Sequence, residues 1–153
     1  THSFALFPYT TLFRSVGAKR EEVERMRKFG EAIGMAFQIQ DDILDFKRDN
    51  NTGKPSNNDL REKKITLPML EVMERKSEEE RRVMLDLLKR ASEDESAVDE
   101  LHRIVVEGGG PELAAETMHA YIHRAMHHAS KYPDTPYRRA MLDLCTFIAE
   151  RDR

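Results

Sequence analysis

The amino-acid sequence predicts an all-α fold, and three observations support this prediction. Apolar residues recur three and four positions apart along most of the 153-residue chain, which is the spacing of one helix face. A serine followed three residues later by glutamate occurs at positions 77 and 92, a pattern that opens helices. No segment alternates apolar and polar residues as a half-buried strand does. We therefore expect one bundle of about six helices.

The first expected helix covers about residues 21–46. It contains Gly30 and Gly34, and two glycines four apart favour close packing against another helix. Its apolar face is formed by residues separated by three, four and their sums, namely Val23, Met26, Ile33, Phe37 and Leu44.

Residues 47–64 are expected to form a loop, because they are rich in Asn, Asp, Lys and Gly. Helical spacing resumes near Leu67, with Pro68 in the first turn. The capping box at Ser77 opens the next helix. Its inward residues are expected to be Val83, Met84, Leu87 and Leu88.

The second capping box, Ser92 to Glu95, is expected to open a helix that ends at Gly108-Gly109-Gly110. Pro111 begins the following helix, which runs to about Tyr132. Two prolines then bracket a turn, and the last helix covers about residues 137–150.

Composition excludes several classes of protein. The net charge is −3, whereas a sequence-independent nucleic-acid binder needs a basic excess, so we expect no nucleic-acid partner. No apolar run approaches the roughly 20 residues of a membrane helix, so we expect no membrane span. The single cysteine, Cys145, excludes an internal disulfide framework and predicts a cytoplasmic location.

Residues 1–15 stand apart from the rest. The stretch from Leu6 to Ser15, Leu-Phe-Pro-Tyr-Thr-Thr-Leu-Phe-Arg-Ser, resembles the in-frame translation of a sequencing adapter. We therefore expect residues 1–15 to be a non-native scar and residues 16–153 to be the natural domain. The alternative is a natural N-terminal strand or helix start.

The sharpest chemical signal is a set of three aspartates near the end of the first expected helix. Asp41 and Asp45 are four apart and share a helix face, Asp42 lies one step round, and Gln38 shares their side. Like charges so close together weaken a helix unless something neutralises them. Carboxylates on one turn, with room for water and phosphate, suit Mg²⁺. The alternative is a solvated helix end.

Lysines follow this acidic turn. Lys54 and Lys64 lie in the expected loop, where they could fold back over a metal-bound diphosphate as point charges. Ordinary loop solubility is the alternative for each lysine. Because the helix upstream of the acids is apolar and includes Phe37, we expect a substrate with a phosphate head and a hydrocarbon tail.

These motifs resemble a known family. Phe-Gln-x-x-Asp-Asp-x-x-Asp, followed by Gly-Lys-Pro, Asp-Leu-Arg and Lys-x-Thr-Leu-Pro, is similar to the trans-polyprenyl diphosphate synthases, which build isoprenoid diphosphates. The resemblance continues to Phe-Ile-Ala-Glu-Arg at 147–151. It covers about residues 16–153, the C-terminal half of a synthase, and implies part of the isoprenoid-synthase helical bundle.

The resemblance implies a role for each candidate residue. Asp41, Asp42 and Asp45 match the second aspartate-rich motif, which binds Mg²⁺ bridged to the allylic diphosphate, with Asp41 as the direct ligand. Lys54 and Lys64 match lysines that hold the diphosphate. Gln38 matches a glutamine that faces the reacting carbons, and Phe37 lines the pocket for the tail. Asp41, Lys54 and Gln38 are thus the expected catalytic residues.

The implied reaction condenses isopentenyl diphosphate with an allylic diphosphate after Mg²⁺ assists ionisation of the allylic carbon–oxygen bond. The resemblance also implies a homodimer in the full-length parent. The family's first aspartate-rich motif is missing from these residues, so we expect the chain alone to be inactive. Asn57 is a mild departure, because it stands where the family's loop often has glycine, and Glu62-Lys63 before Lys64 is also less usual than a glycine.

Two further hypotheses remain open. The chain could be a non-catalytic helical subunit or interaction module that kept the fold, or a generic acidic metal-binding protein whose Mg²⁺ binding is indifferent to diphosphate. Separately, His119, His123 and His127 are four apart and could hold Zn²⁺ or Ni²⁺. The alternative for these histidines is an exposed or interface stripe.

Overall fold

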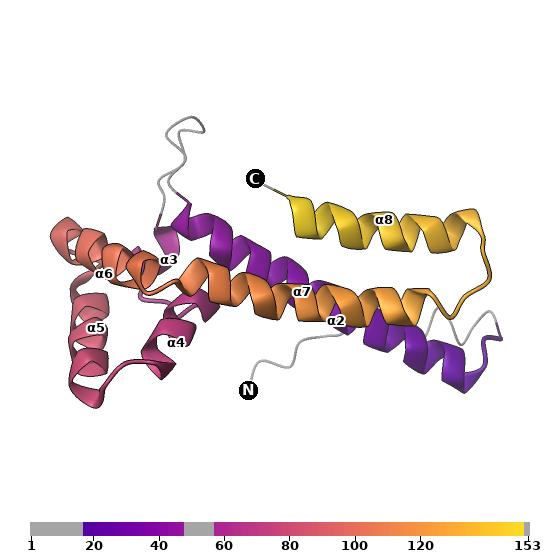
Figure 1. Ribbon diagram of the computed structural model, residues 1–153, viewed down its shortest axis with the longest axis horizontal. Coiled ribbons are helices and arrows are strands. Elements are labelled where there is room, and N and C mark those ends of the chain that lie inside the picture. The colour runs from indigo at the N-terminus through magenta and orange to yellow at the C-terminus, as the bar shows by residue number, and fades with distance from the viewer. Residues whose placement is uncertain (1–16, 48–56, 152–153) are drawn as a thin grey trace.

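Helices alone form the regular structure in the part of the chain that the computed structural model describes, residues 17–47 and 57–151 (Figure 1). This confirms the all-α prediction. Seven helices occur within these ranges, one more than expected, because the short α3 lies inside the segment predicted as a loop. The helices are α2 (Arg20–Phe46), α3 (Asn58–Arg61), α4 (Leu67–Glu74), α5 (Glu78–Arg90), α6 (Glu95–Glu107), α7 (Gly110–Ala129) and α8 (Pro136–Glu150).

One hydrophobic cluster joins the long helices. The helices α2 and α7 lie side by side in opposite directions, and α8 folds back along α7 (Figure 1). Several buried residues at their contacts are alanines, whose small side chains allow the helices to approach closely. Cys145 is fully buried in this cluster. Its larger buried members include Phe29, Ile39, Ile43, Met118, Ile122 and Ile148.

A second cluster joins α4, α5 and α6 to the end of α2. Phe46 and Leu60 enter it from α2 and α3. Ile43 belongs to the first cluster and Phe46 to the second, so the last turn of α2 lies where the two clusters meet. The remaining larger members of the second cluster include Met69, Val72, Met84, Leu87, Leu88, Val98, Leu101 and Val105.

The glycine-rich turn between α6 and α7 is confirmed, and it has two structural causes. Gly109 has φ +73° and caps α7 from the left-handed region, which favours glycine. Gly110 is buried, and a Cβ atom there would lie 2.5 Å from the carbonyl oxygen of Pro68. The start of α7 therefore packs directly against the first turn of α4.

The capping box at Ser77 is also confirmed. The Ser77 hydroxyl accepts a hydrogen bond from the backbone N–H of Glu80 at 3.3 Å, and the Glu80 carboxylate accepts from the backbone N–H of Ser77 at 2.8 Å. The ammonium of Lys76, and the hydrogen bonds that the Ser77 backbone N–H and hydroxyl donate to the carboxylate, lower the pKa of Glu80 to about 2.

Three local predictions were wrong. Asp94, not Ser92, caps α6, because its carboxylate accepts two backbone N–H groups of the first turn. Val83 was expected to face inward but is 56% exposed. Gly30 and Gly34 do not mark close packing, since a Cβ atom at either position would meet no atom within 4 Å.

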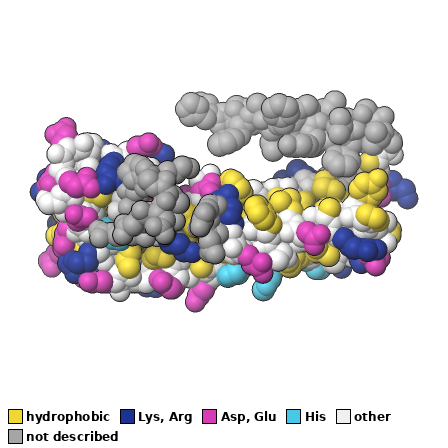
Figure 2. Space-filling view, turned by 90° about the horizontal axis from the view of Figure 1, so that it is seen from above, with side chains coloured by type: hydrophobic (Ala, Val, Ile, Leu, Met, Phe, Trp, Pro, Cys, Tyr) yellow, Lys and Arg dark blue, Asp and Glu magenta, His cyan; other side chains and the backbone are white. Residues whose placement is uncertain are grey.

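The outer face of α8 carries exposed apolar side chains, including Tyr137, Leu144 and Phe147. Figure 2, which looks at the molecule from above, shows hydrophobic side chains gathered over the half in which α8 lies. α8 itself buries only Cys145 and Ile148. Among the described residues, no helix is long and apolar enough to cross a membrane.

Candidate functional site

The last three turns of α2 carry most of the residues that the sequence predicted for the site. Ala36, Ile39, Ile43 and Phe46 are buried along one face of the helix. They fix the orientation of α2, so the acidic side chains between them lie partly exposed. Asp41, Asp42 and Asp45 all lie in the last two turns of α2, and each carboxylate has different partners.

Asp45 holds the start of α3. Its Oδ1 accepts the backbone N–H of Asn58 at 3.0 Å, and its Oδ2 accepts the backbone N–H of Asp59 at 3.0 Å. A four-residue helix has few internal hydrogen bonds, and its first N–H groups need external acceptors. Both oxygens of Asp45 are thus engaged in holding α3 against α2.

Asp42 holds the start of α4 in a similar way. Its Oδ2 accepts the backbone N–H of Leu67 at 3.3 Å, and its Oδ1 accepts the side-chain amide of Gln38 at 3.2 Å. Burial raises the pKa of Asp42, an effect that these two hydrogen bonds oppose. Burial likewise raises the pKa of Asp45. Both carboxylates connect α2 to the helices that follow it.

Asp41 differs, because none of its partners is a backbone N–H group among the contacts that the structure gives. Its Oδ1 forms an ion pair with the guanidinium of Arg151, just beyond the end of α8. The Asp41 side chain is 44% exposed and the Arg151 side chain 16% exposed. The guanidinium also lies over the ring of Phe37, 4.5 Å from its centroid. Asp41 is therefore the carboxylate of the three that holds no helix start through a backbone N–H group.

The structure does not gather the three aspartates into a complete metal site. Within residues 17–47 and 57–151, no group of three or more His, Cys, Asp or Glu side chains could hold a metal ion. This finding includes the stripe of His119, His123 and His127. Mg²⁺, however, keeps several waters and is commonly bound by one or two carboxylates plus substrate phosphates. One partly exposed carboxylate, that of Asp41, suits that mode of binding.

Of the two lysines predicted to hold the diphosphate, Lys54 lies outside the described residues. Lys64 is exposed, and its ammonium pairs with Asp59 at 3.1 Å and with Glu62 at 2.6 Å. These two carboxylates raise the pKa of Lys64. Since the backbone N–H of Asp59 is bound by Asp45, Lys64 is connected to the acidic turn through α3.

The two glycine departures occupy left-handed backbone. Asn57 has φ +65° and Lys63 has φ +58°, and they are the two non-glycine residues with positive φ in the described ranges. They flank α3, so the backbone reverses on both sides of it. Asparagine tolerates this conformation better than most residues.

Sequence reasoning missed a buried polar contact beside the site. The ring nitrogen Nδ1 of His102, on α6, lies 2.7 Å from Oδ1 of Asn57, and both residues are buried. The His102 ring also stacks on Phe46, with 5.9 Å between ring centroids. The backbone N–H of Asn57 donates to the carbonyl of Asp45 at 3.0 Å. Asn57 thus links α6 to the acidic turn, and its unusual place in the motif was the available signal.

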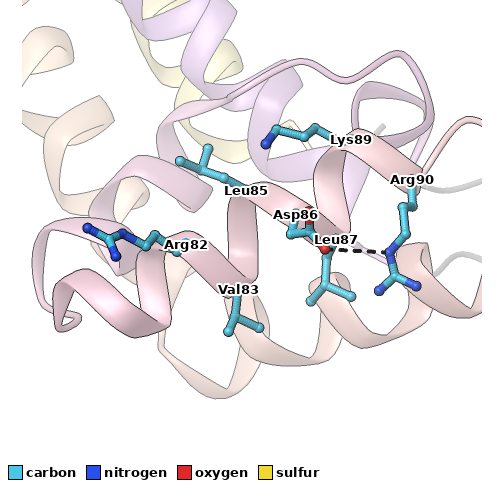
Figure 3. Close-up of a pocket in the computed structure, with 7 residues that line it drawn as sticks. All are labelled: Arg82, Val83, Leu85, Asp86, Leu87, Lys89 and Arg90. Carbon is cyan, nitrogen blue, oxygen red and sulfur yellow. Dashed lines mark ion pairs between the residues drawn. The ribbon is translucent and has the colours of Figure 1, made fainter.

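A pocket on α5 is separate from these residues. The Arg90 and Asp86 side chains, 4.0 Å apart, belong to its lining (Figure 3). The lining residues are Arg82, Val83, Leu85, Asp86, Leu87, Lys89 and Arg90. None of the residues predicted for the site lines it. We therefore assign the candidate site to the end of α2.

Known proteins are similar to this chain over most of its length. Residues 3–105 match the polyprenyl synthetase family. The chain is 31% identical over 137 residues to the short chain isoprenyl diphosphate synthase of Methanothermobacter thermautotrophicus, covering 89% of this chain and 42% of that protein. It therefore spans less than half the length of such relatives.

Solved structures give the same result. A geranylgeranyl pyrophosphate synthase from Bacteroides thetaiotaomicron superposes with a TM-score of 0.80 at 29% identity, over 91% of this chain and 46% of that one. A polyprenyl synthase from Caulobacter crescentus CB15, complexed with calcium and isoprenyl diphosphate, superposes with a TM-score of 0.77 at 26% identity, over 90% of this chain and 42% of that one.

Proposed function

This chain belongs to the polyprenyl synthetase family, and from that membership we propose that it forms part of a Mg²⁺-dependent prenyltransferase. The proposed reaction condenses isopentenyl diphosphate with an allylic diphosphate. The allylic carbon–oxygen bond breaks and releases diphosphate, a carbon–carbon bond forms to the double bond of isopentenyl diphosphate, and a proton is lost. The supporting observation is that Asp41, unlike Asp42 and Asp45, accepts no backbone N–H group in the described part of the chain and is paired with a side chain instead.

Asp41 provides the carboxylate oxygen that would hold the metal in this proposal. When bound, Mg²⁺ would neutralise charge on the leaving diphosphate. Asp42 and Asp45 position the site by fixing the starts of α4 and α3. This division assigns the direct contact to Asp41 and changes the expected roles of the other two to support.

The remaining residues bind and orient the substrate. Lys64 is held beside α3 by carboxylates, and we propose that its ammonium turns to a diphosphate oxygen when substrate arrives. Lys54 is proposed for the same role. Gln38, whose amide donates to Asp42, faces the reacting carbons, and the exposed ring of Phe37 borders the hydrocarbon tail. A cytoplasmic location and a homodimeric parent belong to the same proposal.

Calorimetry with an allylic diphosphate analogue tests this function. The analogue is titrated into the chain with and without Mg²⁺, and we expect binding that depends on Mg²⁺. Asp41→Asn should weaken it about tenfold or more, because a charge-assisted contact is lost. Asp143→Asn, at an exposed position on α8, is the matched control and should bind as wild type does.

Two results would count against the proposal. Mg²⁺ binding that is indifferent to the analogue would favour a generic acidic metal-binding protein. Analogue binding that is indifferent to Mg²⁺ and to Asp41→Asn would favour a non-catalytic module that kept the fold. A sensitive assay with isopentenyl and allylic diphosphates checks the separate expectation that the chain alone has no turnover.

A further inference from the structure

Arg151 is held at the acidic turn by three contacts of different kinds. Its guanidinium pairs with Asp41 and lies over the ring of Phe37. Its backbone carbonyl accepts a hydrogen bond from the side-chain amide of Gln40. Gln40 is buried, 5% exposed, and a buried amide without a partner is costly. The backbone of Arg151 is therefore anchored independently of its charge.

The guanidinium itself is incompletely satisfied. Its Nε is buried and has no hydrogen-bond partner among the described residues. The guanidinium is also attracted to the face of the Phe37 ring, and this kind of attraction acts on any cation of suitable size. Its ion pair with Asp41 has one half-exposed member, and such pairs are weak. We call this arrangement closed, meaning that the guanidinium contacts both Asp41 and the Phe37 ring. An incoming cation can replace these contacts.

We propose that the guanidinium of Arg151 is the resident counter-cation of Asp41 and competes with a divalent cation for that carboxylate. One unit of positive charge already neutralises Asp41 in the cation-free chain. A divalent cation that takes the same oxygen must displace the guanidinium. The affinity of the site for the cation is then reduced by the fraction of molecules in which Arg151 is closed.

This inference rests on the proposed function, because it takes Asp41 as the metal ligand. It adds Arg151, which lies 110 residues from Asp41 in the sequence. It also proposes that Arg151 lowers the affinity of the site for a divalent cation. Removing the positive charge should strengthen cation binding, whereas a purely structural role for Arg151 would weaken it. The sign of the change distinguishes the two roles.

The test is a titration of the whole chain with Mn²⁺, with free Mn²⁺ followed by electron paramagnetic resonance and repeated with Mg²⁺ by calorimetry. Arg151→Gln should lower the dissociation constant about threefold to tenfold, as expected for loss of a weak competing ion pair. Arg151→Lys keeps the charge and should stay within about twofold of wild type. Thermal unfolding of each variant, measured in parallel, reports any loss of folding.

Arg139→Gln is the matched control for charge. Arg139 lies on α8 and pairs with Asp134 at 3.3 Å, far along the helix from Arg151. Arg139→Gln removes the same charge from a position that does not contact Asp41, so it should leave the dissociation constant unchanged. An equal gain in both variants would mean that net charge, not competition at Asp41, controls the affinity, and would overturn the inference.

Two other outcomes also overturn it. If wild type binds the cation, Asp41→Asn abolishes binding, and Arg151→Gln binds equally or more weakly, the competition is absent while the metal assignment stands. If neither wild type nor Arg151→Gln binds Mn²⁺ or Mg²⁺ without diphosphate, the competition proposed for this carboxylate fails, while calorimetry with the diphosphate analogue still decides the metal assignment. The Asp41→Asn variant separates these cases.

Discussion

The two ends of the Asp41–Asp45 turn are built in different ways. Asp45 accepts two backbone N–H groups of α3 and is joined through Asn57 to His102 on α6. Asp41 has a side-chain partner, Arg151, which we propose that a divalent cation can replace. The same residue type therefore serves as scaffold at one end of the turn and, in our proposal, as an exchangeable ligand at the other. What separates the roles is whether the partner is backbone or side chain.

The largest expected effect comes from removing the carboxylate at the scaffold end. Asp45→Ala leaves two backbone N–H groups of α3 without their acceptors, and it should lower the free energy of unfolding by about 2 to 3 kcal/mol. Asp41→Ala removes only a partly exposed ion pair and should cost less than about 1 kcal/mol. Urea denaturation of both variants measures the difference, and equal losses would break the comparison.

A smaller loss of stability is expected from changing His102, which is linked to Asp45 through Asn57. His102→Leu leaves Oδ1 of Asn57 buried without its present donor, and it should cost about 1 to 2 kcal/mol. Asn57→Gly removes that oxygen and suits the left-handed backbone. In a double-mutant cycle the second substitution should therefore recover much of the loss. Additive losses would show that the two residues act separately.

The smallest effect is a pH dependence at Asp42, between the two ends. Burial raises the pKa of this carboxyl in the fold above its ordinary 3.8, so the folded state favours the protonated form. The stabilisation is present at pH values below 3.8 and is lost as the pH rises through the raised pKa. Asp42→Asn should therefore gain stability relative to wild type between pH 4 and pH 7. The gain should be about 0.5 kcal/mol or less, because water screens the carboxylate. Urea midpoints at both pH values measure it, and a relative loss would contradict the sign.

Local patterns carried the prediction of most helices. Helix period, the Ser77 box and the Gly109–Pro111 break depend on neighbours within one turn, and all three were confirmed. The error at Ser92 has the same local origin, since Asp94 offers a better acceptor two residues later. The short α3 was missed because Asp45, 13 and 14 residues upstream, supplies the acceptors for its first N–H groups.

Spacing on one helix identified the acidic turn and the Gln38 contact, which is a four-residue step. It could not separate the roles of Asp41 and Asp45, because their partners come from other helices. Arg151 and His102 lie 110 and 45 residues from the groups they contact. No periodicity connects positions that far apart, so these contacts required the folded arrangement. The metal and substrate roles of Asp41, Lys54 and Lys64 stay predictions.

Cys145 can report directly how tightly α8 packs against the rest of the fold. It is the only cysteine in the sequence, its side chain is fully buried against α2 and α7, and burial raises the pKa of its thiol. A maleimide can alkylate this sulfur only while α8 is detached from α2 and α7, so the labelling rate reports on the detachment of α8. One unmodified thiol thus lets chemists time the detachment of the helix that leads to Arg151, with no engineered probe.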